Sequence, residues 1–73
     1  GAGLNPAIAR ELFAVLKAVA QRGVGVMAVE HRLDIALDYA DYAYFMHEGK
    51  VVIEGIPSEV FRHPLVAEVY LGK

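Results

Sequence analysis

His31 is the residue of this sequence whose type and position best suit it to chemistry. It directly follows a short apolar run at 24–29, which predicts a strand buried on both faces, and it precedes a short predicted helix. In open α/β sheets, ligands bind at the carboxyl ends of strands, and an imidazole can donate a hydrogen bond to a phosphate oxygen there. The alternative is that His31 only caps the following helix. The position makes His31 a candidate phosphate-binding residue.

The other polar residues have ordinary structural explanations. Asn5 precedes Pro6, an arrangement typical of a helix N-cap followed by the first helical position. His31, His47 and His63 lie sixteen residues apart, which matches no metal-ligand pattern, and the sequence has no cysteine. Neither GxxxxGK[ST] nor GxGxxG is present, and no arrangement typical of a serine or cysteine nucleophile is seen. These residues alone do not name a reaction.

Hydrophobic periodicity predicts the elements that position these residues. Apolar residues spaced three and four apart predict a helix over 6–21. The pattern then predicts a strand over 24–29 and a helix over 32–40. It also predicts two strands over 41–47 and 50–54 around a Glu48-Gly49 turn, and two helices over 57–62 and 65–71. The predicted fold is α/β in the order α-β-α-β-β-α-α. Two parallel strands are joined by a helical crossover, and the hairpin adds an antiparallel strand.

The composition favours a piece of a larger domain. The 73 residues are 56% hydrophobic, more than so small a globule can easily hide, and a strand buried on both faces needs further strands beside it. The alternative is a small α/β domain that completes itself by oligomerisation. Seven basic against nine acidic residues argue against a nucleic-acid partner. The longest apolar run is far too short to span a bilayer.

Five short motifs, in this order, carry a family resemblance: Ala2-Gly3-Leu4-Asn5-Pro6; Val29-Glu30-His31 with Asp34; His47-Glu48-Gly49-Lys50-Val51; Glu54-Gly55-Ile56-Pro57-Ser58-Glu59-Val60; and Tyr70-Leu71-Gly72. Together they closely resemble the C-terminal part of an ABC transporter ATP-binding subunit, of the branched-chain amino-acid type. Urea-type and lipopolysaccharide-export ATPases share the Tyr-Leu-Gly ending. One departure is Ile56, where the family often has a capping Thr or Ser.

The resemblance implies a C-terminal fragment of one nucleotide-binding domain with a P-loop NTPase fold. Residues 1–6 match the D-loop, so that Ala2, Gly3, Leu4, Asn5 and Pro6 would contact the opposite subunit. Residues 24–31 match a strand and the H-loop, with His31 as the catalytic switch histidine that contacts the γ-phosphate. Residues 41–54 match a strand hairpin, and residues 57–71 match C-terminal helices.

The resemblance also implies the activity of the parent protein. It would be the ATP-hydrolysing subunit of an ABC importer for branched-chain amino acids, using ATP and Mg²⁺. It would pair with a second ATP-binding subunit, as a homo- or heterodimer, and with membrane permease subunits, in the cytoplasm on the inner face of the membrane. The fragment lacks the Walker A, Q-loop, signature and Walker B motifs, so we expect it to be inactive, with no ATP or metal bound. The alternatives are a stand-alone, non-catalytic α/β interaction module, or an ABC ATPase for another substrate such as urea or lipopolysaccharide.

Overall fold

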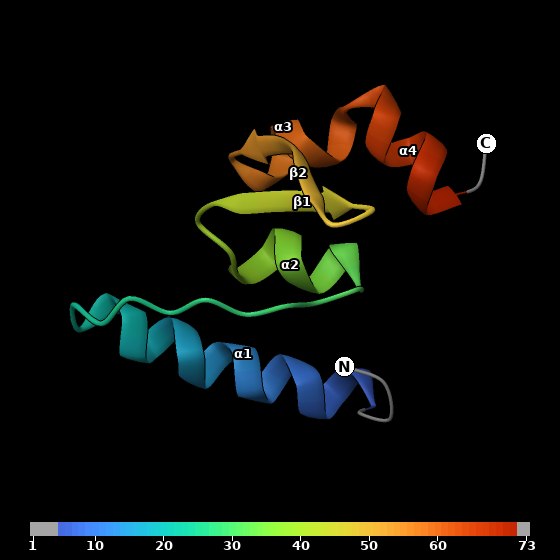
Figure 1. Ribbon diagram of the computed structural model, residues 1–73. Helices are drawn as coiled ribbons and strands as arrows, with labels where there is room; N and C mark the ends of the chain where they lie inside the picture. The colour runs from blue at the N-terminus through green and yellow to red at the C-terminus, as the bar shows by residue number, and fades with distance from the viewer. Residues whose placement is uncertain (1–4, 72–73) are drawn as a thin grey trace. The chain divides into compact units, whose positions relative to one another are not determined.

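The computed structural model describes residues 5–71, and the chain divides into two compact units after Tyr39 (Figure 1). Helices α1 (Pro6–Gln21) and α2 (Leu33–Tyr39) belong to the first unit. Strands β1 (Ala43–His47) and β2 (Lys50–Gly55) and helices α3 (Pro57–Arg62) and α4 (Pro64–Leu71) belong to the second. The order over the described residues is α-α-β-β-α-α, one strand fewer than predicted.

Helix α1 begins and ends where local signals in the sequence place its ends. The Asn5 side chain accepts a hydrogen bond from the Ile8 N–H at 3.1 Å, and Pro6 occupies the first helical position, where a missing N–H costs nothing. After Arg22 the chain leaves the helix through Gly23, whose φ of 97° lies in the left-handed region that glycine adopts most easily. The predicted bounds of this helix are therefore confirmed.

Helix α1 is apolar on two sides. One side is buried or half-buried and carries Ala9, Phe13, Leu16 and Ala20. The other side is exposed and carries Ile8, Leu12, Val15 and Val19. The exposed apolar residues are spaced four, three and four apart, so they form one stripe that is suited to further cover.

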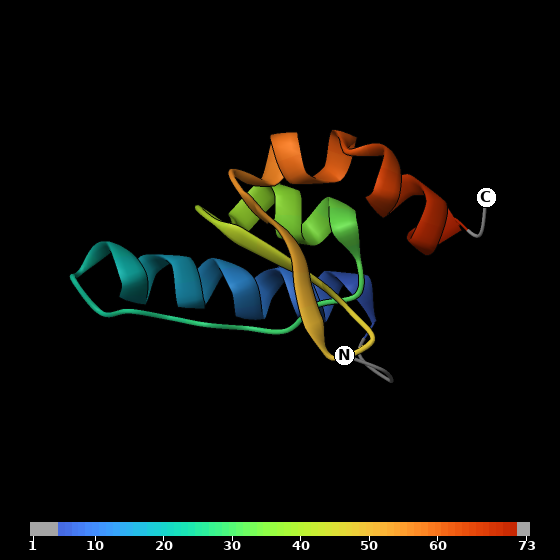
Figure 2. The same ribbon diagram turned by 45° about the horizontal axis from the view of Figure 1, so that its top comes forward.

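The predicted strand at 24–29 is wrong for the chain as this structure has it. Residues 24–30 run as an extended segment alongside α1, but they pair with no other strand of the described residues (Figure 2). Met27 is 86% exposed and Val29 82%. A β-strand is stabilised by backbone hydrogen bonds to a neighbouring strand. The described residues contain no strand beside residues 24–29. The predicted parallel pair is therefore absent as well.

The hairpin of the second unit forms as the turn chemistry predicts. Strands β1 and β2 pair antiparallel, and β1 begins two residues later than predicted. Glu48 and Gly49 have φ of 51° and 77°, the pair of positive values that a two-residue type I′ turn requires. An irregularity at Phe45/Met46 leaves one extra residue on β2, as in a β-bulge.

Helices α3 and α4 complete the second unit. Helix α3 packs on both strands of the hairpin and on α4, and it buries Pro57 and Val60, while α4 buries Val66. His63 separates the two helices, and its Nδ1 accepts a hydrogen bond from the Leu65 N–H at 3.1 Å. The predicted bounds of α3 are confirmed, and α4 begins one residue earlier than expected.

Candidate functional site around His31

His31 lies at the junction between the extended segment and α2. Its side chain is exposed, and the first residue of α2 is two positions further along the chain. An exposed imidazole at the end of an extended segment is accessible to a ligand, as the candidate role requires. The strand that was expected to carry it is not formed here, so its position depends on the loop and on α2.

The carboxylate of Glu30 organises the backbone of this loop. Its Oε1 accepts hydrogen bonds from the N–H groups of His31 at 2.8 Å and Arg32 at 3.0 Å, and it lies 3.5 Å from the Arg32 Nε. The side chain of Glu30 is only 4% exposed. The Arg32 carbonyl in turn accepts the Ala36 N–H, the first bond of the helix. The capping side chain before α2 is therefore Glu30 rather than His31.

The hydrogen bonds at Glu30 also set its charge. Burial by itself raises the pKa of this carboxyl, because a charged group is less stable away from water. The two backbone N–H groups and the Arg32 guanidinium stabilise the ionised form and outweigh burial, so the pKa lies below its usual value. Glu30 therefore stays a carboxylate, and an acceptor for the loop, at neutral pH.

Arg10 joins α1 to α2 through two carboxylates. Its Nη1 donates to Asp38 Oδ2 at 2.6 Å, and its Nη2 donates to Asp34 Oδ2 at 3.0 Å. The hydrogen bond to Asp38 is the main cause of the raised pKa of the guanidinium. Burial lowers this pKa, whereas the hydrogen bonds to Asp34 and Tyr39 raise it further. The sequence did not point to this contact of Arg10. The available signal was the spacing of Asp34 and Asp38, because residues four apart on a helix lie on the same face and can bind one cation together.

The predicted D-loop residues fall mostly outside the described part of the chain. Ala2, Gly3 and Leu4 are not among residues 5–71. Asn5 and Pro6 are described, and they form the start of α1, where the Asn5 side chain is engaged by the Ile8 N–H. Of the two D-loop residues within 5–71, Asn5 bonds its own helix and makes no hydrogen bond to His31.

His31 can donate a hydrogen bond to a phosphate oxygen. Across residues 5–71 no group of three His, Cys, Asp or Glu side chains could hold a metal ion, and the sequence contains no phosphate loop. A complete site for ATP and Mg²⁺ does not fit on the described residues alone.

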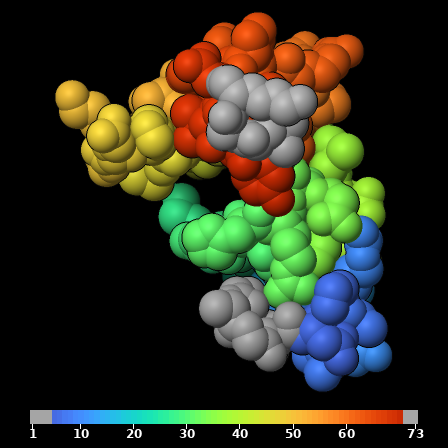
Figure 3. Space-filling model, turned by 90° about the vertical axis from the view of Figure 1, so that its right-hand side faces the viewer, coloured from blue at the N-terminus to red at the C-terminus, as the bar shows by residue number. Residues whose placement is uncertain are grey.

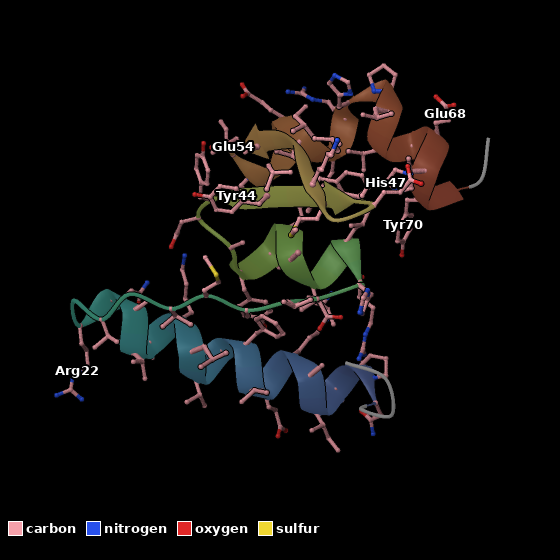
Figure 4. The ribbon with its side chains drawn as sticks, in the orientation of Figure 1. Arg22, Tyr44, His47, Glu54, Glu68 and Tyr70 are labelled. Atoms are coloured by element: carbon pink, nitrogen blue, oxygen red, sulfur yellow. The ribbon has the colours of Figure 1, made fainter. Side chains whose placement is uncertain are left out.

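A second polar contact, also missed from the sequence, lies on the hairpin. The Tyr42 hydroxyl donates to Glu54 Oε1 at 2.9 Å, and the rings of Tyr42 and Tyr44 meet edge to face with centroids 5.2 Å apart. Tyr44 and Glu54 face each other across the strands, as Figure 4 shows. The hydrogen bond to Glu54, with smaller effects of burial and charge, raises the pKa of Tyr42. Cross-strand contacts of this kind stabilise the hairpin.

The chain is similar to ATP-binding proteins of ABC transporters. It is 41% identical over 71 residues to the protein named Probable branched-chain amino acid transport ATP-binding protein LivG of Archaeoglobus fulgidus, covering 97% of this chain and 28% of that protein. It is 35% identical over 71 residues to the Lipopolysaccharide export system ATP-binding protein LptB of Acidithiobacillus ferridurans, covering 97% of this chain and 30% of LptB. It is 36% identical over 76 residues to the LivG of Methanocaldococcus jannaschii, covering 99% of this chain and 30% of that protein. No family model and no solved structure matches.

Nearly the whole chain is therefore similar to one part of ABC transporter ATP-binding proteins. The chain spans less than a third of the length of the relatives named above. The resemblance to a fragment of such a subunit, with branched-chain amino-acid proteins among its relatives, is confirmed. None of the helices within residues 5–71 is long and apolar enough to cross a bilayer.

Proposed function

We propose that this chain is the C-terminal part of the ATP-hydrolysing subunit of an ABC importer for branched-chain amino acids. The observation that carries the proposal is the match of nearly the whole chain to two archaeal proteins named for that transport. The subunit couples ATP hydrolysis to transport across the membrane. Its ATP and Mg²⁺ are held chiefly by residues outside these 73.

In this function His31 is the catalytic residue of the chain. Its imidazole donates a hydrogen bond to the γ-phosphate of ATP and helps to orient the attacking water. Two features support the role: the side chain is exposed, and the backbone around it is held by the carboxylate of Glu30. A donor held in place before the reaction stabilises developing charge without reorganising, which is the usual source of large rate effects.

In the proposed function the subunit also binds other proteins. Residues 1–6, with Asn5 and Pro6 at the start of α1, form the D-loop, which contacts a second ATP-binding subunit in a homo- or heterodimer. The pair docks on membrane permease subunits at the inner face of the membrane. The match to LptB supports a second candidate, an ATPase that serves lipopolysaccharide export.

Turnover by the full-length protein tests the role of His31. We expect His31→Ala to lower the rate of ATP hydrolysis about 10²- to 10³-fold while ATP binding is retained, since contacts made to developing charge act mainly on the rate. His47→Ala is the matched control, because His47 is also an exposed histidine but lies beside the hairpin turn. Near-normal turnover in His31→Ala would show that His31 has no catalytic role.

The substrate is tested separately, in membrane vesicles that contain the complete transporter. ATP-dependent uptake of leucine, isoleucine or valine supports the first candidate. ATP hydrolysis stimulated by lipopolysaccharide, without uptake of these amino acids, supports the second. An upstream coding sequence without a Walker A loop would favour the non-catalytic interaction module instead.

A further inference from the structure

We propose that Arg10 is a positioning residue for His31, which it keeps in place by fastening α2 to α1. The inference rests on the proposed catalytic role of His31 and adds to it a residue outside the expected motifs. It follows from three contacts within the first unit of the chain: an Arg fork, an aromatic pair and a capped loop.

The fork is the first contact. The two terminal nitrogens of Arg10 reach two carboxylates that lie one helical turn apart on α2, at 2.6 Å to Asp38 and 3.0 Å to Asp34. A planar guanidinium that bonds two fixed carboxylates restrains both the rotation and the sliding of the helix that carries them. Lysine, with a single ammonium group, could not fix the same geometry.

The aromatic pair is the second contact, and it lies on the same side of α1. Phe13 is three residues after Arg10, so the two side chains share a face of the helix. The ring of Phe13 lies against that of Tyr39, with centroids 6.3 Å apart, close to the carboxyl end of α2. Figure 3 shows the first turns of α1 in blue against α2 in green. Helix α2 is thus held to α1 near both of its ends.

Helix α2 depends on such contacts because it is short. It has 7 residues, and isolated helices of that length are not stable in water. Its packing therefore decides where it lies. Asp34 is in its first turn, so the bond from Arg10 acts directly beside the end that carries the loop.

The capped loop is the third contact, and it carries the restraint from α2 to His31. The Glu30 carboxylate bonds the N–H groups of His31 and Arg32, and the Arg32 carbonyl bonds into α2. Residues 30–32 therefore move with the first turn of α2. A shift of α2 on α1 displaces the His31 backbone by a similar distance, and small misplacements of catalytic groups cost large factors in rate.

The two ion pairs contribute little to overall stability, which makes the proposal testable. The side chains of Arg10, Asp34 and Asp38 are 36%, 72% and 54% exposed, and ion pairs in contact with water stabilise folded proteins only weakly. Loss of Arg10 should therefore leave the protein folded and change mainly the placement of α2.

The experiment is a double-mutant cycle in the full-length protein. We expect Arg10→Gln to lower kcat on the order of tenfold, with the KM for ATP and the thermal midpoint nearly unchanged. In the His31→Ala background, Arg10→Gln should cause no further loss, because its effect passes through the imidazole. Arg10→Lys should recover only part of the rate. Asp38→Asn weakens the shorter of the two ion pairs but keeps Arg10, and we expect it to cause the same loss of kcat. It serves as a second variant if Arg10→Gln does not fold.

The control is Arg22→Gln. It removes the same charge from the other end of α1, where Figure 4 shows the Arg22 side chain pointing away from α2. Its turnover should equal that of the unmodified protein. Wild-type turnover in both Arg10→Gln and Asp38→Asn would overturn the inference alone, as would an equal loss with and without His31. Near-normal turnover in His31→Ala overturns the proposed function and this inference with it.

Discussion

At the scale of single residues, side chains that bond the backbone decide where this chain changes direction. Asn5 starts α1, Glu30 holds the loop before α2, and His63 accepts the Leu65 N–H at the start of α4. Each satisfies an N–H group that a helix end would otherwise leave to water. Ile56 is the exception, since it stands at the N-cap of α3 without a side-chain acceptor.

Ile56→Thr should therefore stabilise the protein. Ile56 has the extended backbone of an N-cap, with φ −64° and ψ 141°, and its carbonyl accepts the first bonds of α3. The residue is 51% exposed, so only part of the burial of an isoleucine is at stake in the replacement. A threonine hydroxyl there would complete a capping box with Glu59, and such caps stabilise by about 1 kcal/mol. Thermal and denaturant unfolding of the full-length protein measures the change.

Ile56→Val is the matched control for this substitution. Valine has the shape of threonine but no oxygen, so the difference between the two variants reports the cap alone. We expect Thr to exceed Val in the free energy of unfolding by about 1 kcal/mol. Equal stabilities would mean that the N–H groups of the first turn of α3 gain nothing from an acceptor at position 56.

Glu54→Gln should lower the pKa of Tyr42 toward its ordinary value. The hydrogen bond to the Glu54 carboxylate favours the protonated phenol, and this is the first cause of the raised pKa. Because the pKa is raised in the folded state, the stabilisation is complete below about pH 10 and is lost as pH rises through the folded pKa. Ultraviolet absorbance of tyrosinate against pH follows the shift. In a Tyr42→Phe background, Glu54→Gln should leave the remaining tyrosine titration unchanged, and a shift that persists there would assign the effect to another tyrosine.

At the scale of elements, the first unit has more apolar surface than its own helices cover. The exposed side of α1 carries Ile8, Leu12, Val15 and Val19, and the extended segment exposes Val24, Val26, Met27 and Val29. The backbone of that segment also has no strand to pair with among residues 5–71. Unpaired extended backbone with apolar side chains is a template for association with another chain.

The 73-residue chain on its own should therefore self-associate. Sedimentation velocity over a range of concentrations measures this, and we expect species larger than the 8.0 kDa monomer. Met27→Lys with Val29→Lys should reduce association, because charges on an open strand oppose pairing. Gln21→Lys adds charge at the end of α1 and should have little effect. A clean monomer at high concentration would count against an exposed association surface.

At the scale of the whole molecule, these 73 residues lack the phosphate loop that an ATP site requires. Hydrolysis of ATP depends on a phosphate cradle, Mg²⁺ ligands and a residue that positions water. The sequence contains no phosphate loop, and the relatives are more than three times as long as the matched segment. The ATP hydrolysis that we propose therefore requires more than these 73 residues.

The isolated chain should hydrolyse no ATP above background and bind ATP no more tightly than millimolar. Release of phosphate from ATP with and without Mg²⁺ measures the first, and equilibrium titration with ATP measures the second. The full-length protein, assayed alongside, is the positive control. Clear Mg²⁺-dependent hydrolysis by the 73 residues would contradict the fragment interpretation.

The sequence alone determined the elements whose ends depend on neighbouring residues. The bounds Pro6–Gln21 and Pro57–Arg62 followed from an N-cap position, a proline at the first helical position and the breaks after each helix. The Glu48-Gly49 turn followed from the positive φ that glycine allows. The order of the motifs was also sufficient to recognise the resemblance to a fragment of an ABC transporter ATP-binding subunit.

Only the tertiary structure decided what depends on residues far apart. Segment 24–29 has the composition of a strand, but a strand needs partners, and the described chain leaves this one unpaired. Nothing near Arg10 in sequence indicates that it bonds Asp34 and Asp38, which lie 24 and 28 residues further on. Local signals act within a few residues through backbone hydrogen bonds and dihedral preferences, whereas these contacts form only when packing brings α1 and α2 together.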